Sequence, residues 1–189
     1  MTKPFTATAS SLRLRLYSNA VRVGSADDGQ IMDNPVVQKA KASDAIEISQ
    51  LILGVAHYFT LDPNGAGAER FFASMSSKAI ETYITNPDFD YYTCRINGEL
   101  AGVVCARDGT HLFHLFVAPK YQRLGIAKHL WSHIKESRFN RSGVNEITVN
   151  STPYAVPVYK KLGFIEADTK VERDGIAFVP MRLVLHSSN

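Results

Sequence analysis

A basic, glycine-containing loop between an apolar strand and a helix is the segment best suited to chemistry. Residues 111–117 are rich in β-branched and aromatic side chains and end at Ala118-Pro119. The loop Gln122-Arg123-Leu124-Gly125-Ile126-Ala127 follows, and helical spacing begins within it. The first N–H groups of a helix lack partners within the helix, and the helix dipole favours negative charge there. We therefore expect residues 122–127 to hold an anion such as a pyrophosphate.

The common nucleotide-binding patterns are absent from the chain. It contains neither GxxxxGK[ST] nor GxGxxG, so the loop does not indicate a nucleoside triphosphate or a dinucleotide. Gly125 would instead let the backbone approach an anion closely, with Arg123 adding charge at the rim.

The elements that must position this loop are predicted from hydrophobic periodicity and turn residues. Asp44 and Glu47 stand in capping-box register before the first helix, Asn97-Gly98 predicts a tight hairpin, and Pro180 suggests a bulge or an edge position. The expected helices cover residues 44–59, 67–85 and 125–137, with a short one from Thr152-Pro153 to Gly163. The expected strands cover residues 36–40, 91–96, 99–106, 110–117, 144–149, 164–172 and 176–185.

This order predicts an α/β domain with a mixed, mostly antiparallel sheet flanked by about four helices. A helix connects strands 110–117 and 144–149, and a crossover of that length favours a parallel pair. Residues 36–189 would form this domain. Residues 1–35 would be an N-terminal appendage and linker, hairpin-like because apolar and basic residues alternate around Ser18-Asn19. Disorder and a targeting segment are the alternatives there, since residues 1–26 carry no acidic residue.

The composition of the chain limits the classes of partner and the sites that can be expected. The net charge of +3 over 189 residues is too small to favour nucleic acid or an anionic membrane. No apolar run approaches the roughly 20 residues that span a bilayer, so a cytoplasmic protein is expected. Cys94 and Cys105 lie inside predicted strands without metal-ligand spacing, which indicates reduced core residues and no metal site.

Two stretches together resemble a known superfamily. Residues 117–127 are similar to motif A, [QR]xxGx[GA], of the GNAT superfamily of acetyl-CoA-dependent N-acetyltransferases. Residues 150–164 resemble its second signature, a short helix ending in Y-x-x-x-G-F, here Tyr159 to Phe164. The element order agrees over about residues 36–185. The departure is Ala127, where many members have glycine.

The resemblance implies a binding mode for acetyl-CoA. The strand before the loop would splay from strand 144–149, giving a gap for the pantetheine arm. Backbone groups of Leu115, Phe116 and Val117 would bind the acetyl and pantetheine amides, and Asn150 would contact the arm from the opposite wall. The pyrophosphate would lie on backbone N–H groups of the loop, namely those of Gln122, Arg123, Leu124, Gly125, Ile126 and Ala127.

Three residues are candidates for proton transfer. Tyr159 occupies the family's position for the acid that protonates the departing thiolate, and a packing tyrosine is the alternative. His111 and His114 lie on the strand beside the expected acetyl group and are candidate bases. Strand alternation puts them on opposite faces unless a bulge intervenes, and water-relayed deprotonation remains an alternative.

The resemblance therefore predicts an N-acetyltransferase that transfers acetyl directly to a primary amine of a small molecule or protein. A non-catalytic acyl-CoA sensor or interaction module is the alternative. Residues 57–70 and the last hairpin would wall the substrate site, with His57, Tyr58, Asp62, Glu69 and Arg70 as polar candidates. The N-terminal segment also suits pairing across subunits in a homodimer.

Overall fold

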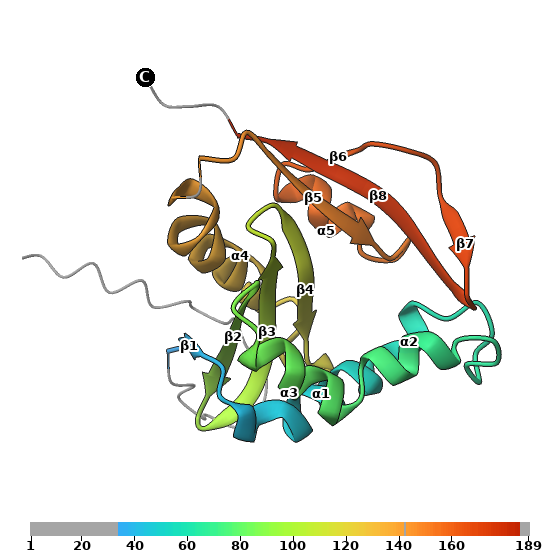
Figure 1. Ribbon diagram of the computed structural model, residues 1–189, viewed down its shortest axis with the longest axis horizontal. Helices are drawn as coiled ribbons and strands as arrows, with labels where there is room; N and C mark the ends of the chain where they lie inside the picture. The colour runs from blue at the N-terminus through green and yellow to red at the C-terminus, as the bar shows by residue number, and fades with distance from the viewer. Residues whose placement is uncertain (1–33, 142, 186–189) are drawn as a thin grey trace, which may run out of the picture.

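The computed structural model describes residues 34–141 and 143–185, which build one mixed sheet with helices on both faces (Figure 1). The strand order is β1-β2-β3-β4-β5-β8-β6, and β7 also pairs with β8. Among the strands of the described residues, only β4 and β5 pair in parallel. The strands are β1 Val36–Lys39, β2 Phe89–Ile96, β3 Glu99–Arg107, β4 His111–Val117, β5 Glu146–Ser151, β6 Ile165–Glu166, β7 Val171–Arg173 and β8 Ile176–Val184. The predicted fold class is confirmed, while the predicted N-terminal hairpin lies outside the described residues.

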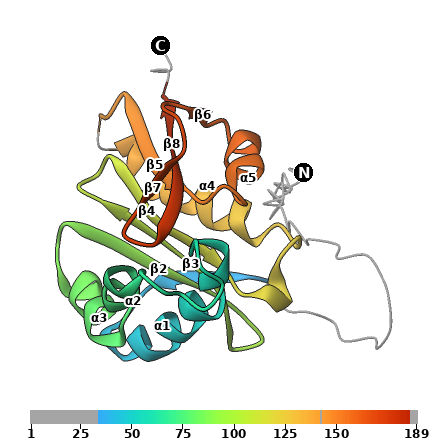
Figure 2. The same cartoon turned by 90° about the vertical axis from the view of Figure 1, so that its right-hand side faces the viewer.

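Five α-helices of the described chain cover the sheet. Figure 2 shows α1, α2 and α3 on one side and α4 and α5 on the other. None of them is long and apolar enough to cross a membrane. The helices are α1 Ala45–Gly54, α2 Glu69–Ser74, α3 Ser77–Thr85, α4 Ile126–Ser137 and α5 Val156–Lys161.

The single helix predicted for residues 67–85 is wrong. It divides into α2 and α3 at Ser76, whose backbone is extended and whose hydroxyl accepts a hydrogen bond from the N–H of Ala79. This cap starts a new helix, although the apolar spacing continues across the break. Periodicity alone could not reveal the interruption.

The capping box expected at Asp44 and Glu47 is also wrong. The Asp44 carboxylate accepts from the backbone N–H of Lys41, one turn before α1, and both carboxylates bind Arg95 on β2. The acids therefore tie the start of the helical layer to the sheet.

The predicted hairpin turn is confirmed, and the last hairpin is more broken than expected. Asn97 and Gly98 both have positive φ, as a type I′ turn requires. The predicted strand 164–172 is two short strands, β6 and β7. Pro180 faces the interruption, where its carbonyl accepts from the N–H of Ala167. Since proline has no N–H, it cannot return that bond, and pairing with β6 stops there.

Each face of the sheet buries its own apolar core. One core lies under α4 and α5 and includes Leu130, Trp131 and Phe164. The other lies under α1 and α3 and includes Ile48 and Ile80. Cys94 and Cys105 are both free thiols buried in the sheet, as predicted. These two cores hold the central strands in place, and two cavities lie where β4 and β5 separate.

Candidate active site

The site begins where β4 and β5 separate. His111 and Thr148 are the only registered pair between these strands, and the N–H of Thr148 donates to the carbonyl of Thr110. Beyond this point the two strands diverge (Figure 1). Backbone groups on the facing edge of β4 therefore have no strand partner.

Strand alternation decides which backbone groups face this gap. The N–H of Ala118 donates to Ala101 on β3, so Phe116, two residues earlier, also directs its backbone towards β3. The backbone N–H and C=O groups of Leu115 and Val117 therefore point the other way, into the gap. The carbonyl of Val117 accepts from the Gln122 side chain, which braces the loop. Of the three backbones predicted to bind the cofactor, Leu115 and Val117 have the orientation for it.

A groove of about 860 Å³ runs from this gap to the basic loop. Arg123 and Gly125 both have left-handed backbones, with φ of 64° and 81°. Such alternation turns successive N–H groups towards a common point, which is the geometry of an anion nest. Gly125 also forms the N-terminal cap of α4, a helix of 12 residues. The unpaired N–H groups of its first turn add to this anion site.

The groove lining is positively charged. Arg123, Lys128 and Lys161 line it, and no aspartate or glutamate of the described chain does. The three side chains come from the loop, α4 and α5, so charge surrounds the anion site on more than one side. A pyrophosphate, with its diffuse negative charge, fits such a groove.

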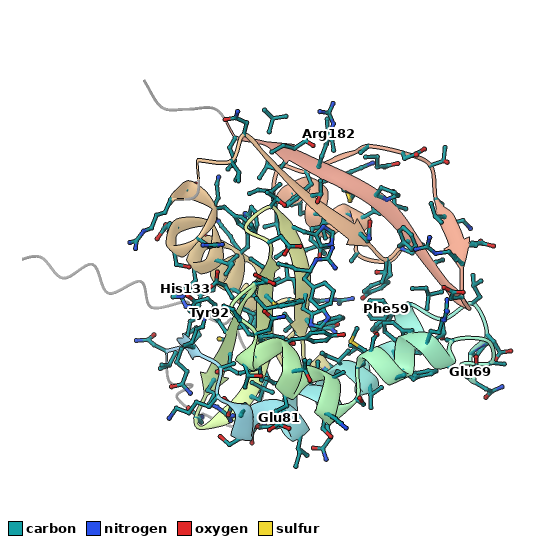
Figure 3. The ribbon with its side chains drawn as sticks, viewed as in Figure 1. Phe59, Glu69, Glu81, Tyr92, His133 and Arg182 are labelled. Atoms are coloured by element: carbon teal, nitrogen blue, oxygen red, sulfur yellow. The ribbon has the colours of Figure 1, made fainter. Side chains whose placement is uncertain are left out.

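A second cavity, of about 270 Å³, adjoins the groove on the side of the last hairpin. Its outer wall forms where the segment after α1 meets the β7–β8 turn: the Leu61 N–H donates to Gly175, and the Ala177 N–H donates to Phe59. Figure 3 places Phe59 between the helical layer and β8. Gly67 and Gly175 pack so closely that a side chain on Gly175 would collide with the backbone of Gly67.

The predicted substrate walls, residues 57–70 and the last hairpin, thus lie together, but their lining differs from expectation. Among the polar candidates, only Tyr58 lines either cavity, and it lines the groove. The second cavity is lined there mainly by apolar side chains, Phe59, Phe71, Ile176 and Phe178, together with the charged Arg173.

A β-bulge brings both candidate histidines to the second cavity. His114 pairs with Cys105, but the next pair is Leu112 with Ala106, so Phe113 is an extra residue in β4. Strict alternation would have separated His111 and His114, and the bulge cancels that separation. Both histidines line the cavity.

Both imidazoles are held in the neutral form. Burial and the nearby Arg107 lower the pKa of His111 to about 4. Burial, His111 and Arg107 lower the pKa of His114 to about 3. His111 is half-buried, and its Nδ1 lies 2.8 Å from the Thr148 hydroxyl. His114 is almost wholly buried, with Nδ1 2.9 Å from the Tyr91 hydroxyl and Nε2 unpaired within the described chain.

Tyr159 is fixed by the end of α5. The N–H of Phe164 donates to the carbonyl of Tyr159, and the N–H of Gly163 donates to Lys160. With Gly163 at φ 97°, this pair of bonds forms a Schellman motif. The aromatic contact between Tyr159 and Phe164, with ring centroids 5.6 Å apart, supplies the hydrophobic closure of that motif. The spacing Y-x-x-x-G-F is thus a device that ends a helix and orients its tyrosine.

The start of α5 differs from the prediction. The hydroxyl of Thr152 accepts a hydrogen bond from the N–H of Ala155, and its carbonyl accepts from the N–H groups of Ala155 and Val156. These bonds form a separate turn before the helix, and α5 begins only at Val156. Thr152 and Ala155 line both cavities, so this turn belongs to the boundary between them.

Tyr159 lies where the two cavities meet. Only 7% of its surface is exposed, yet it lines both the groove and the second cavity. Burial raises the pKa of its hydroxyl, which therefore keeps its proton at neutral pH. Leu115 and Phe116 line both cavities as well. The predicted Asn150 lines the second cavity rather than the groove.

Sequence reasoning missed two arginines of the second cavity, Arg107 and Arg173. Both lie next to an Asp-Gly pair and outside the predicted strands 99–106, 164–172 and 176–185, so neither was assigned a role. The register in the structure places Arg107 opposite His111, the candidate base.

Comparison with known proteins agrees with this geometry. A model described as the acetyltransferase (GNAT) domain matches residues 59–185, about two thirds of the chain. The chain belongs to the GNAT acetyltransferase family. No curated protein sequence matches it.

Solved GNAT structures share its fold at low sequence identity. A GCN5-related N-acetyltransferase from Rhodopseudomonas palustris superposes with a TM-score of 0.67 at 16% identity, covering 84% of this chain and 100% of the other. The PaiA N-acetyltransferase of Thermoplasma acidophilum, solved with coenzyme A, gives 0.64 at 16%, covering 81% and 100%. The ribosomal-protein-S18-alanine N-acetyltransferase of Escherichia coli gives 0.59 at 19%, covering 82% and 97%.

Proposed function

We propose that this GNAT protein is an N-acetyltransferase that moves an acetyl group from acetyl-CoA to a primary amine of a small molecule or protein. Transfer is direct, within a ternary complex. The observation that carries the proposal is the meeting of the groove and the second cavity at Tyr159. We call them the donor groove and the acceptor pocket from here on.

The donor groove holds acetyl-CoA. Backbone N–H groups of residues 122–127 and the first turn of α4 bind the pyrophosphate, and Arg123, Lys128 and Lys161 neutralise its charge. The free backbone edge of Leu115 and Val117 binds the pantetheine amides as an added strand would. The thioester supplies the activated acetyl group, at the junction with the acceptor pocket.

His111 is the proton acceptor. Its ring is neutral at pH 7 and half-buried, so it can take a proton from the amine and pass it to water. A weak base suffices, because the amine nitrogen becomes far more acidic as it bonds to the acetyl carbon. His114, sealed by Tyr91 and neighbouring aromatic rings, shapes the pocket.

Tyr159 is the proton donor. The structure gives its hydroxyl no hydrogen-bond partner within the described residues, and the hydroxyl stays protonated because burial raises its pKa. In the balanced step the C–N bond forms, the C–S bond breaks, the amine proton goes to His111 and the thiolate takes the Tyr159 proton. Solvent then restores both groups.

A non-catalytic acyl-CoA sensor would need the donor groove alone. The acceptor pocket, with neutral imidazoles on one wall and Tyr159 on another, favours the enzyme. It is also the part of the site in which an amine can lie beside the thioester.

The direct test is a panel of primary amines and peptides incubated with acetyl-CoA, scored by release of free thiol. We expect saturable, amine-dependent release above the rate in buffer. Tight binding of acetyl-CoA with no amine-dependent release from any member would support the sensor instead.

A further inference from the structure

The charge of the acceptor pocket is one-sided. Arg107, from the end of β3, and Arg173, from β7, both line it. No aspartate or glutamate of the described chain does. A pocket for a polycationic amine would present carboxylates to the additional ammonium groups, and these are missing from the wall.

The two guanidinium groups are only partly neutralised by their neighbours. The Nε of Arg107 lies 3.2 Å from the Asp108 carboxylate, and the Nε of Arg173 lies 3.9 Å from Asp174. Asp174 is shared with Arg70, 3.6 Å away. Within the described residues, the terminal nitrogens of Arg107 and Arg173 form no hydrogen bond. These nitrogens present the paired donors that bind a carboxylate in bidentate fashion.

Arg107 adds positive charge beside the histidines. Burial is the largest cause of the lowered pKa of both His111 and His114, and Arg107 lowers both further, whereas Asp108 opposes it only at His111 and more weakly. An additional ammonium group in this pocket would meet the same positive charge. A negatively charged group would be stabilised by it.

The remaining lining is aromatic and aliphatic. Phe59, Phe71, Phe113 and Phe178 come from four different segments around the cavity, and Arg107 and Arg173 lie over the rings of Phe113 and Phe178. The Arg107 side chain is 40% exposed and that of Arg173 is 72% exposed, so both guanidinium groups lie at the rim of the pocket. The pocket therefore offers an apolar surface with cationic groups at its edge.

We propose that the acceptor is a small amino carboxylate with an apolar or aromatic frame, whose carboxylate is held at the cationic edge of the pocket, where Arg107 and Arg173 lie, while its amine faces the donor groove. This inference rests on the proposed acetyl transfer. It predicts poor acetylation of polyamines and of amines without an acidic group.

Matched acceptors test the inference: phenylalanine, phenethylamine, which lacks only the carboxylate, and spermidine as a polycation. With acetyl-CoA and thiol release as the readout, we expect kcat/KM for phenylalanine to exceed that for phenethylamine by roughly tenfold or more. Equal or better use of phenethylamine or spermidine would overturn the inference and leave the acetyltransferase proposal standing.

Variants assign the effect to the arginines. Arg107→Gln and Arg173→Gln should each lower the ratio of kcat/KM for phenylalanine to kcat/KM for phenethylamine by roughly tenfold. Because both amines use the same base, this ratio cancels any effect of Arg107 on His111. The control is Arg70→Gln. Arg70 contacts Asp174, as Arg173 does, but Arg70 does not line the pocket. An unchanged preference for phenylalanine in both pocket variants would contradict the assignment.

A binding measurement separates this inference from the proposed reaction. Calorimetric titration with 3-phenylpropionate, which has the frame and the carboxylate but no amine, needs no catalysis. Binding that weakens in Arg107→Gln and Arg173→Gln but persists in Arg70→Gln supports the carboxylate site even if no amine is acetylated. Absence of binding, or equal binding in all variants, overturns it.

Discussion

At the scale of single residues, the acceptor pocket holds its ionisable groups in defined states. Burial and Arg107 keep two imidazoles neutral, and burial keeps the Tyr159 hydroxyl protonated. The base and the acid thus start in the protonation states that acetyl transfer requires.

The pKa of His114 predicts how stability depends on pH. The folded chain keeps this imidazole neutral down to about pH 3, whereas the unfolded chain binds a proton near pH 6.5. Between these values the unfolded state holds the extra proton, so this contribution to the free energy of unfolding falls as pH is lowered from 6.5. His114→Asn, whose side-chain amide can donate a hydrogen bond to Tyr91 or accept one from it, should reduce that slope by about 1.4 kcal/mol per pH unit in urea titrations. Equal slopes in both proteins would contradict a neutral buried His114.

The pKa of His111 predicts how kcat/KM depends on pH. With its folded pKa at about 4, His111 remains neutral throughout the range from pH 8 to pH 6. We therefore expect kcat/KM, corrected for the neutral fraction of the amine, to show no histidine limb near pH 6.5 and an acid limb near pH 4. His111→Asn should remove the acid limb and lower kcat/KM. An acid limb centred at 6.5 that disappears in this variant would contradict the depressed pKa.

The limits of sequence prediction are clearest at the histidines. Alternation along β4 placed His111 and His114 on opposite faces, and only the extra residue Phe113 brings both to one pocket. A bulge depends on pairing with the neighbouring strand, which no local pattern in β4 encodes. Arg107 was missed for the same reason, because its role follows from its pairing with His111.

At the scale of helices and strands, short backbone motifs at the helix ends position the residues of the site. The Schellman motif at the end of α5 orients Tyr159, and a nest with two left-handed residues precedes α4. These devices were predictable from Gly163 and Gly125, since glycine at a helix end is a strong local signal. The break at Ser76 was not, because the apolar spacing runs through it.

Replacing Gly163 tests the first device. At φ 97° an alanine is strained, and its Cβ would also lie 3.2 Å from Leu183, so Gly163→Ala should lower the free energy of unfolding by about 1–2 kcal/mol. The control is Gly54→Ala at the end of α1, where the Cβ meets nothing within 4 Å and alanine favours the helix. Chemical denaturation measures both. Equal stability of the two variants would contradict the motif.

Replacing Gly125 tests the second device. Gly125 and Gly98 share a φ of 81° and open space at the Cβ position, but only Gly125 lies in the donor groove. Leucine at either position should therefore cost similar stability, about 1–2 kcal/mol. Only Gly125→Leu should also abolish coenzyme A binding, measured by calorimetry. Retained tight binding in Gly125→Leu would exclude this loop as the pyrophosphate site.

At the scale of the whole molecule, function arises where two halves of the sheet diverge. Strands β1 to β4 and strands β5 to β8 meet at one registered pair, and the gap beyond it opens to both cavities. The sequence could predict this arrangement, because the helix between strands 110–117 and 144–149 requires a parallel pair and the two motifs flank it. It could not predict which side chains line the acceptor pocket, since they come from segments distant along the chain.

The most direct test of the account is the kinetics of Tyr159→Phe, because Tyr159 alone is assigned to protonate the thiolate at the junction of both cavities. With an amine that the wild type acetylates, we expect kcat to fall by roughly 100-fold while the affinity for acetyl-CoA stays nearly unchanged. Tyr154→Phe, which removes a hydroxyl from the donor groove alone, should keep the wild-type rate. Unchanged turnover in Tyr159→Phe would contradict the central claim.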